Sequence, residues 1–381
     1  MNFDFSDDEQ QLREAVRRWV EKACSFDARR ATVAAGGFDP TRWSELADLG
    51  VLGLGLSEDD GGMGLGPVAA MIAAEELGRG LVPEPVAAVS RVAASLLAGA
   101  SDELRAAWLP RLAAGDALVV LAQQERAARY RLNHVSTRAT AGADGRWQLD
   151  GAKSLVPVGD RADAFLVPAR VHGAMDAEDG IALFLVERSA PGVATRGYLQ
   201  VDGTRAAELT LTQVTEASLV LPAGTAFAAL ELAQDVGIAA LAAEAVGAMD
   251  ALFALTTDYL ATRKQFGVPI GSFQALRHRV ADMKMQLELA RSMSYFATLK
   301  LGDPAPVRRR ALAQVKVQLG QSLRFVGQQS VQLHGGIGCT DEYVGSHYFR
   351  RLTAMEMQFG DTLRHLGEVS ARMQDTAGVF G

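Results

Sequence analysis

Apolar residues recur every three or four positions in the first part of the chain, which is the spacing of one face of an α-helix. Ser6 and Glu9 form a capping-box pattern just before the first such stripe, so we predict a helix over residues 7–24. The same periodicity predicts helices over residues 40–49, 67–80, 84–99 and 101–115. Residues 1–116 are therefore expected to form an N-terminal helical domain.

The pattern changes near Ala117, where the apolar runs become short and are separated by Gly, Asp and Pro. Such runs are typical of an antiparallel β domain, which we place at residues 117–225. The predicted strands lie at residues 118–122, 147–149, 165–168, 181–186 and 208–214.

Long helical stripes return at Phe227 and continue to the end of the chain. An Ala-rich helix over 227–262 is followed by apolar stripes over 276–290 and 312–333, and by a fourth helix over 353–375. Residues 226–381 are expected to form a C-terminal four-helix bundle. The predicted fold class is therefore α+β and mostly α, with no apolar run long enough to span a membrane.

The composition of the chain argues against several classes of function. The chain has 381 residues, a net charge of −7 and 49% hydrophobic residues, as expected for a globular protein that does not bind nucleic acid. Two distant cysteines, Cys24 and Cys339, indicate neither a disulfide framework nor a metal site. The first residues lack the pattern of a signal peptide, so we expect a cytoplasmic protein without a membrane partner. The sequence contains no nucleophile-elbow motif, so a hydrolase is not expected.

Two segments carry more chemistry than a helix end needs. Residues 263–267 (Arg-Lys-Gln-Phe-Gly) place an Arg and an aromatic ring beside a turn, and Phe273-Gln274 follow. Arg can bind phosphate oxygens and aromatic rings can cover a flat ligand, although a basic solvated helix end is the structural alternative. Residues 332–340 contain three glycines in four positions, Gly335, Gly336 and Gly338, which allow a ligand to approach the backbone closely.

These two motifs, at this spacing, resemble those of the acyl-CoA dehydrogenase family, and the resemblance covers essentially the whole chain. It implies a FAD-dependent dehydrogenase that acts on an acyl-CoA substrate, in a tetramer (a homo- or hetero-oligomeric dimer of dimers) where both motifs reach the ADP half of a neighbour's FAD. Arg263 and Gln265 would contact the pyrophosphate, and Phe273 and Gln274 the adenosine. The full set of cofactor-binding residues implied by the resemblance is Arg263, Gln265, Phe266, Phe273, Gln274, Gln332, Leu333, His334, Gly335, Gly336 and Thr362. The Gly-rich segment 50–66 resembles the family's loop near the acyl-chain pocket.

The catalytic base of the family is missing from both of its usual positions. The family's Tyr-Glu-Gly-Thr sequence corresponds here to residues 359–362, which places Gly360 at the position of the Glu. The alternative position on the long helix is Gly237. Asp361 is the remaining candidate base, with a helix cap or an ion pair as its structural alternative.

The β domain departs from the family as well. Residues 123–130, which include Glu125, replace the family's flavin-contacting segment, and Leu155 and Pro157 stand where a stacking Trp and a Thr are usual. Pro157 has no N–H to donate. We therefore hypothesise a subunit that holds only the ADP half of a shared FAD, while a partner supplies the base. The alternatives are a catalytically silent scaffold and a flavin monooxygenase- or oxidase-like relative. Residues 244–249 and 359–361 are similar to the small subunit of pimeloyl-CoA dehydrogenase, which implies a dicarboxyl-CoA substrate.

Overall fold

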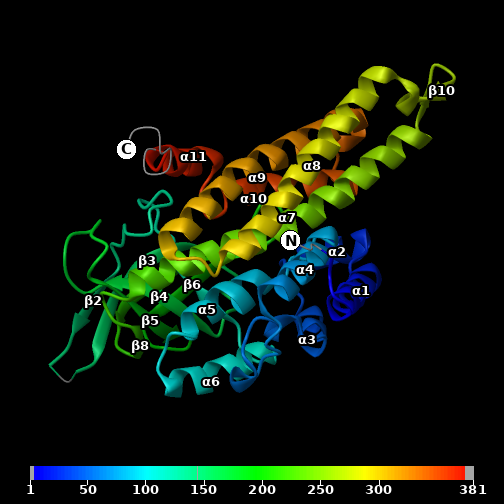
Figure 1. Ribbon diagram of the computed structural model, residues 1–381. Coiled ribbons are helices and arrows are strands. Elements are labelled where there is room, and N and C mark those ends of the chain that lie inside the picture. Colours follow the sequence, from blue (N-terminus) through cyan, green and yellow to red (C-terminus); the bar gives the residue numbers. More distant parts are fainter. Residues whose placement is uncertain (1–3, 144, 374–381) are drawn as a thin grey trace. The chain divides into compact units, whose positions relative to one another are not determined.

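The computed structural model describes residues 4–143 and 145–373. The chain forms two compact units, each assembled from separated segments. One comprises residues up to Arg30, Pro67–Val82 and residues from Ile238 onward; the other comprises Ala31–Gly66 and Pro83–Gly237. Each unit has its own arrangement of helices or strands (Figure 1).

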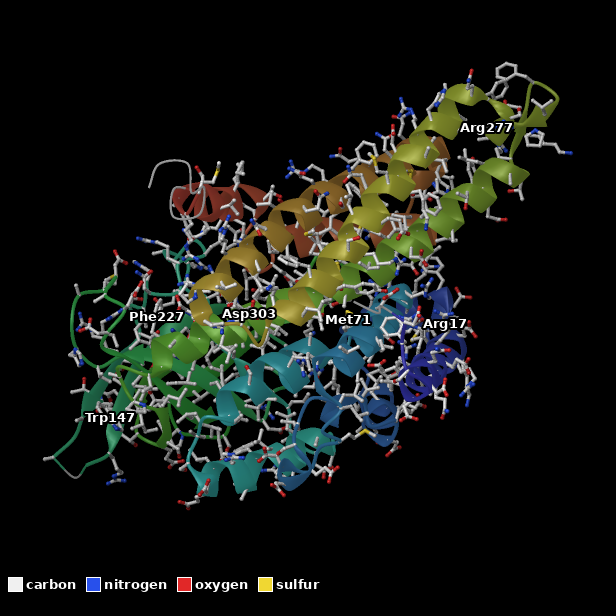
Figure 2. The ribbon with its side chains drawn as sticks, viewed as in Figure 1. Arg17, Met71, Trp147, Phe227, Arg277 and Asp303 are labelled. Atoms are coloured by element: carbon white, nitrogen blue, oxygen red, sulfur yellow. The ribbon has the colours of Figure 1, made fainter. Side chains whose placement is uncertain are left out.

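The helical unit is built around three long helices, α7 (Ala226–Thr262), α8 (Gln274–Lys300) and α9 (Ala305–His334), with α7 included from Ile238 onward. They are joined by short connections, and α10 (Val344–Met357) and α11 (Thr362–Ala371) follow. Figure 1 shows the α7–α8 connection at one end of these helices and α11 toward the other. In Figure 2, Arg277 lies near the first end and Asp303 lies in the α8–α9 connection. The predicted apolar stripes form one buried core, which includes Val246, Leu287 and Leu319.

The N-terminal helix α1 (Asp7–Ala23) also belongs to this unit. Helix α4 (Gly66–Arg79) belongs to it from Pro67 onward. Ser6 and Glu9 form the predicted capping box. Helices α4 and α7 cross with their backbones in contact, because a Cβ added to Gly78 would lie 1.9 Å from the carbonyl oxygen of Glu244, and one added to Gly247 would lie 1.7 Å from that of Glu75. Gly247, within the segment 244–249, is thus required by the packing of α7 against α4.

The second unit contains a sheet and short helices. Its helices are α2 (Phe26–Ala34, whose first residues belong to the helical unit), α3 (Pro40–Asp48), α5 (Ala94–Leu97) and α6 (Asp102–Ala113). A π-helix, Ala87–Ala93, leads directly into α5, where the sequence predicted one ordinary helix over 84–99. Sequence periodicity did not predict α2.

The sheet has the strand order β6-β7-β3-β2-β4-β5-β8, with β1 paired to β4. The strands are β1 (Val119–Leu121), β2 (Arg138–Ala141), β3 (Trp147–Pro157), β4 (Ala164–Arg170), β5 (Ile181–Glu187), β6 (Val193–Leu199), β7 (Arg205–Val214) and β8 (Ala217–Leu221). Strands β1 and β2 both run parallel to β4, so the sheet is mixed and not purely antiparallel as expected. Trp147, labelled in Figure 2, packs edge-on against Phe184 of β5.

Two further expectations are corrected by the structure. The predicted helix over 353–375 is broken between α10 and α11, because Phe359 and Gly360 take positive φ values of 58° and 103°. Residues 374 and 375 of that prediction lie outside the described residues. The expectation that no apolar run is long enough to span a membrane was also wrong for the described part of the chain. Helix α7 has a window of mean hydropathy 1.8, although 67% of that window is buried, as in the core helix of a globular protein.

Candidate nucleotide-binding site

The turn after α7 is a tight hairpin that presents its side chains to solvent. Strand β9 (Lys264–Gln265) pairs with β10 (Val268–Pro269), and the two residues between them both have positive φ, which is the type I′ geometry. Phe266 at its tip is 91% exposed and packs edge-on against Phe273, with ring centroids 6.0 Å apart. Exposed aromatic rings at such a turn are available to a planar ligand or a neighbouring chain.

Arg263 lies at the base of this hairpin. Its backbone N–H donates to the carbonyl of Tyr259 and its carbonyl accepts from Ile270, each over 2.8 Å. The guanidinium is exposed and forms no hydrogen bond or ion pair with any residue in the described part of the chain. Its position is therefore set by the backbone, while its donors remain available for an anion. Gln265 and Gln274 are also exposed.

The Gly-rich loop begins where α9 ends. Gly335 has φ 64° and ψ −141°, and the short helix Gly335–Cys339 follows. Gly335 and Gly336 are exposed, and a Cβ added to either would meet no atom within 4 Å. Gly338, by contrast, is buried, and its Cβ would lie 2.9 Å from the carbonyl oxygen of Val331. Two of the three glycines thus face open space, whereas the third permits local packing.

His334 joins the Gly-rich loop to the end of α7. Its ring packs against that of Tyr259 with centroids 4.6 Å apart, one helical turn before Arg263. His334 Nδ1 lies 2.8 Å from the carbonyl oxygen of Ser330, so we assign the proton to Nδ1, which leaves Nε2 to accept from the hydroxyl of Tyr343 at 2.7 Å. Burial lowers the pKa of His334, which keeps the ring neutral in this arrangement. The structure therefore brings the two motifs together at one end of the bundle.

The residues of the two motifs divide into exposed and buried sets. Arg279 of α8 donates to Gln329 of α9 over 2.9 Å and links the two helices next to the motifs. Leu333 and His334 are buried and position the loop from within the chain. The exposed residues are Arg263, Gln265, Phe266, Phe273, Gln274, Gln332, Gly335 and Gly336.

Asp361 and Thr362 lie in a different place, at the start of α11. Asp361 is the N-cap of that helix, and its Oδ1 accepts from the backbone N–H of Arg364 over 2.8 Å, which confirms the capping alternative. Thr362 donates its hydroxyl to Glu356 Oε1 over 2.7 Å. Neither side chain is part of the exposed surface formed by the two motifs.

Gly360 cannot carry a catalytic side chain in this conformation. Its φ of 103° is unfavourable for any L side chain, and an added Cβ would lie 2.8 Å from Nε2 of His365. That imidazole nitrogen lies 2.9 Å from the carbonyl oxygen of Phe359. Burial lowers the pKa of His365 to about 4, so the ring is neutral near pH 7. The space beside Gly360 is thus occupied by a buried imidazole.

A buried lysine that the sequence analysis did not identify stabilises the break between α10 and α11. Lys316 of α9 donates to the carbonyls of Met355 and Glu356, each over 3.1 Å. Burial lowers its pKa to about 8. A cation at the last carbonyls of a helix is favourable, and here it stabilises the end of α10. The signal in the sequence was a lysine within the apolar stripe that contains Leu312, Val315 and Leu319.

In the β domain, Glu125 is buried and fully engaged. Its carboxylate accepts from the backbone N–H and hydroxyl groups of Ser136 and Thr137 and from Lys153 Nζ at 2.8 Å. Burial alone would raise the pKa of Glu125, but Lys153 and the hydrogen bonds lower it to about 2. Lys153 also donates to the carbonyl of Pro168. Glu125 therefore ties strands and loops together and has no free face for a ligand.

The segment expected to face the flavin is irregular in β3. The pairing of β3 with β7 shifts between Lys153 and Val156, and Leu155 lies in this shift with φ 55° and 53% exposure. Pro157 pairs with Ala206 of β7. A bulged Leu provides no aromatic ring for stacking, and a Pro provides no N–H. Over the described residues there is also no cluster of His, Cys, Asp and Glu suited to a metal ion.

The fold and these surfaces define a class of protein: a helical, sheet and helical arrangement whose C-terminal bundle exposes an arginine hairpin and a glycine loop side by side. Models of the acyl-CoA dehydrogenase N-terminal, middle and C-terminal domains match residues 6–116, 121–216 and 229–374. The chain belongs to the acyl-CoA dehydrogenase family. FAD is the cofactor of this family.

Three similar proteins illustrate this membership. Acyl-CoA dehydrogenase IpdE2 of Mycobacterium tuberculosis is 30% identical over 348 residues, covering 91% of each chain. A solved variant of the Tcur3481–Tcur3483 steroid ACAD is 29% identical, with a TM-score of 0.88 over 98% of this chain and 99% of that one. The ChsE4–ChsE5 complex of M. tuberculosis is 26% identical, with a TM-score of 0.87 over 99% and 100%.

Proposed function

We propose that this chain is one subunit of a hetero-oligomeric FAD-dependent acyl-CoA dehydrogenase. In this proposal it holds the nucleotide end of a FAD whose flavin end belongs to a partner subunit. The proposal rests on one difference between the two ends of the cofactor. Exposed groups suited to a nucleotide are present, whereas the residues expected at the base position and beside the flavin form contacts within the chain instead.

The residues of the two motifs are suited to the nucleotide end of FAD. Arg263 offers a free planar guanidinium, which suits the pyrophosphate. Gly335 and Gly336 have open space where other residues have a side chain, so their backbone can approach a ligand. Phe266 of the hairpin and Phe273 after it offer exposed rings. Together with Gln265, Gln274 and Gln332, these residues would hold the ADP half.

The residues expected beside the flavin end of FAD are not suited to bind it. When bound, FAD supplies the hydride acceptor for α,β-dehydrogenation of the thioester, and a carboxylate must remove the α-proton. Gly360 has no room for that carboxylate, and Asp361 is engaged as a helix cap. Leu155 and Pro157 lack the groups that would contact a flavin ring. The partner would therefore supply the base and the flavin pocket. The named pairs of chains in the Tcur3481–Tcur3483 and ChsE4–ChsE5 structures support such an assembly.

We further propose a dimer of dimers and a dicarboxyl acyl group as the substrate. The acyl group is supported by the similarity of residues 244–249 and 359–361 to the small subunit of pimeloyl-CoA dehydrogenase. It is tested by comparing dicarboxyl and monocarboxyl thioesters with the assembled complex. A dye-linked assay with and without oxygen separates this dehydrogenase from an oxidase or monooxygenase.

The test of the shared cofactor is co-expression with a dehydrogenase-like chain from the same genome that retains the Tyr-Glu-Gly-Thr sequence. We expect the chain alone to purify without a stoichiometric flavin and without activity, and the complex to contain FAD and dehydrogenate an acyl-CoA. In the complex, Arg263→Ala should weaken FAD retention, whereas Arg18→Ala, at an exposed pair with Glu14, should not. Full FAD occupancy and activity of the chain alone would contradict the proposal.

A further inference from the structure

Tyr343 and His334 lie at the two ends of the Gly-rich loop and are joined by a hydrogen bond. His334 is the last residue of α9, and Tyr343 is the N-cap residue of α10. The hydroxyl of Tyr343 lies 2.7 Å from Nε2 of His334. This contact connects the two ends of residues 335–342, and a contact between its ends restricts the conformations that a loop can adopt.

The direction of this hydrogen bond is set by the groups behind the imidazole. Nδ1 of His334 lies 2.8 Å from the carbonyl oxygen of Ser330, which can only accept, so Nδ1 carries the proton and Nε2 accepts from Tyr343. The hydroxyl of Ser330 lies 2.9 Å from that of Thr256 in α7, and Thr256 donates to the carbonyl of Leu252. The Tyr343 hydroxyl is therefore the donor at one end of a polar chain that connects α7, α9 and α10.

The imidazole also contacts two aromatic rings. Its centroid lies 4.6 Å from that of Tyr259 and 4.9 Å from that of Tyr343. Tyr259 belongs to the last turn of α7, directly before the hairpin that carries Arg263. The orientation of His334 thus depends on Tyr343 from one side of the loop and on the end of α7 from the other.

Gly345 provides the space that the ring of Tyr343 requires. A Cβ added to Gly345 would lie 2.7 Å from Cε1 and 3.1 Å from Cδ1 of Tyr343. Gly345 lies within α10 and is not among the glycines with positive φ, so its backbone does not require a glycine. Alanine is the more favourable residue inside a helix. The glycine is therefore explained by the position of the Tyr343 ring.

The two halves of the loop are held by different contacts. In the second half, the carboxylate of Asp341 accepts from Arg350, and its carbonyl accepts from Nε2 of His347 over 2.9 Å. In the first half, the N–H of Gly335 donates to carbonyls at the end of α9. Loss of the Tyr343 hydroxyl should therefore loosen the first half, which carries the exposed glycines, more than the second.

We infer that Tyr343 is a positioning residue for the nucleotide-binding loop. Its hydroxyl holds the ring of His334, and that ring fixes the direction in which the backbone leaves α9 at Gly335. This role rests on the proposed function, in which Gly335 and Gly336 approach the ADP half of FAD. Tyr343 acts through His334, so no contact between its own hydroxyl and the cofactor is required.

FAD titration of the complex with the partner subunit, followed by flavin fluorescence, tests the inference. Tyr343→Phe removes the hydroxyl and keeps the ring, whereas Gly345→Ala displaces an intact tyrosine. We expect each to weaken FAD binding about two- to tenfold, the effect of one neutral hydrogen bond. Tyr348→Phe is the matched control, because it removes from the same helix a hydroxyl that donates to the carbonyl of Arg79, and it should leave FAD binding unchanged.

Variants of His334 show whether Tyr343 acts through it. His334→Leu should weaken FAD binding, and His334→Gln, which keeps an acceptor and a donor, should restore most of it. Tyr343→Phe should cause no further loss in His334→Leu, since two residues that act through one contact are not additive. Additive losses would contradict the inference.

Hydrogen exchange of the chain alone gives a result that does not require the cofactor. In Tyr343→Phe, amides in residues 335–339 should exchange about two- to tenfold faster, and those of α10 should not. Unchanged FAD binding in Tyr343→Phe, or an equal loss in Tyr348→Phe, would overturn the inference. A wild-type complex without FAD would contradict the shared-cofactor proposal instead, and exchange at 335–339 would then decide whether Tyr343 positions the loop.

Discussion

Replacing Lys153 by Met tests whether Glu125 is a structural residue, as its contacts indicate. Lys153 and Glu125 have side chains 0% and 4% exposed, and Nζ lies 2.8 Å from Oε1. Removing one partner of a buried ion pair leaves the other charge uncompensated, which typically costs about 3–5 kcal/mol. We therefore expect Lys153→Met to destabilise the sheet by about that amount.

The pKa of Glu125 gives the pH dependence of this contribution. Burial acts to raise it, but Lys153 and the Ser136 hydrogen bonds reduce it from 4.5 to about 2. Because the folded pKa is lower than the unfolded pKa, this contribution to stability is present above pH 4.5 and is lost as the pH falls toward 2.

Hydrogen exchange followed by mass spectrometry measures this effect locally. In Lys153→Met, amides in residues 134–137 and 150–157 should exchange roughly a hundredfold faster, since each 1.4 kcal/mol corresponds to a factor of ten. Lys284→Met is the matched control, because Lys284 forms an exposed pair with Glu288 over 2.7 Å and should change little. Unchanged exchange in 134–137, together with altered FAD binding in the complex, would refute the structural role of Glu125.

Three further predictions concern the bundle. Arg263→Ala should weaken FAD binding to the complex by about tenfold or more without changing the melting temperature, because its exposed side chain has no partner in the described part of the chain; a flavin-fluorescence titration and a melting curve check both parts. Gly360→Glu should lower stability by about 1–3 kcal/mol and create no activity in the chain alone, since φ is 103° and His365 fills the space; an active variant would contradict this. Burial reduces the pKa of His365 from 6.5 to about 4, so stability should decline as the pH falls from 6.5 to 4, and His365→Gln should decline less in urea titrations over that range.

The helical elements could be predicted because their apolar residues recur locally. The stripe that includes Leu12 and Val16 and the Ala-rich run after Phe227 gave helices within one or two residues of α1 and α7. The break after α10 could not be predicted from periodicity, because a glycine within an apolar pattern does not by itself show that its φ is positive, as it is at Gly360. Phe359, with φ 58°, carries no such signal in the sequence.

The sheet was harder to predict than the helices. Strand β6 alternates between exposed and half-buried residues and has no apolar run, and β8 is short. The parallel pairing of β1 with β4 joins segments more than 40 residues apart, so it depends on tertiary packing. Local patterns therefore indicated strands without defining their partners.

The candidate site could be predicted in part. The arginine hairpin and the Gly-rich loop have recognisable sequences, and the structure places them side by side through the Tyr259–His334 contact. Lys316 could not be assigned from sequence, because its burial and its partners, the carbonyls of Met355 and Glu356, depend on a helix that is distant along the chain. The structural role of Glu125 and Lys153 could likewise not be predicted, because it depends on the contact between these two residues.

In the proposed assembly, this chain contributes to a FAD that it does not hold alone. The most direct measurement is the number of FAD molecules per chain, from absorbance and quantitative amino-acid analysis, for the purified chain and for its complex with a base-bearing partner. We expect no stoichiometric FAD in the chain alone and fewer flavins than chains in the complex. One tightly bound FAD per chain in the homomeric protein would contradict it.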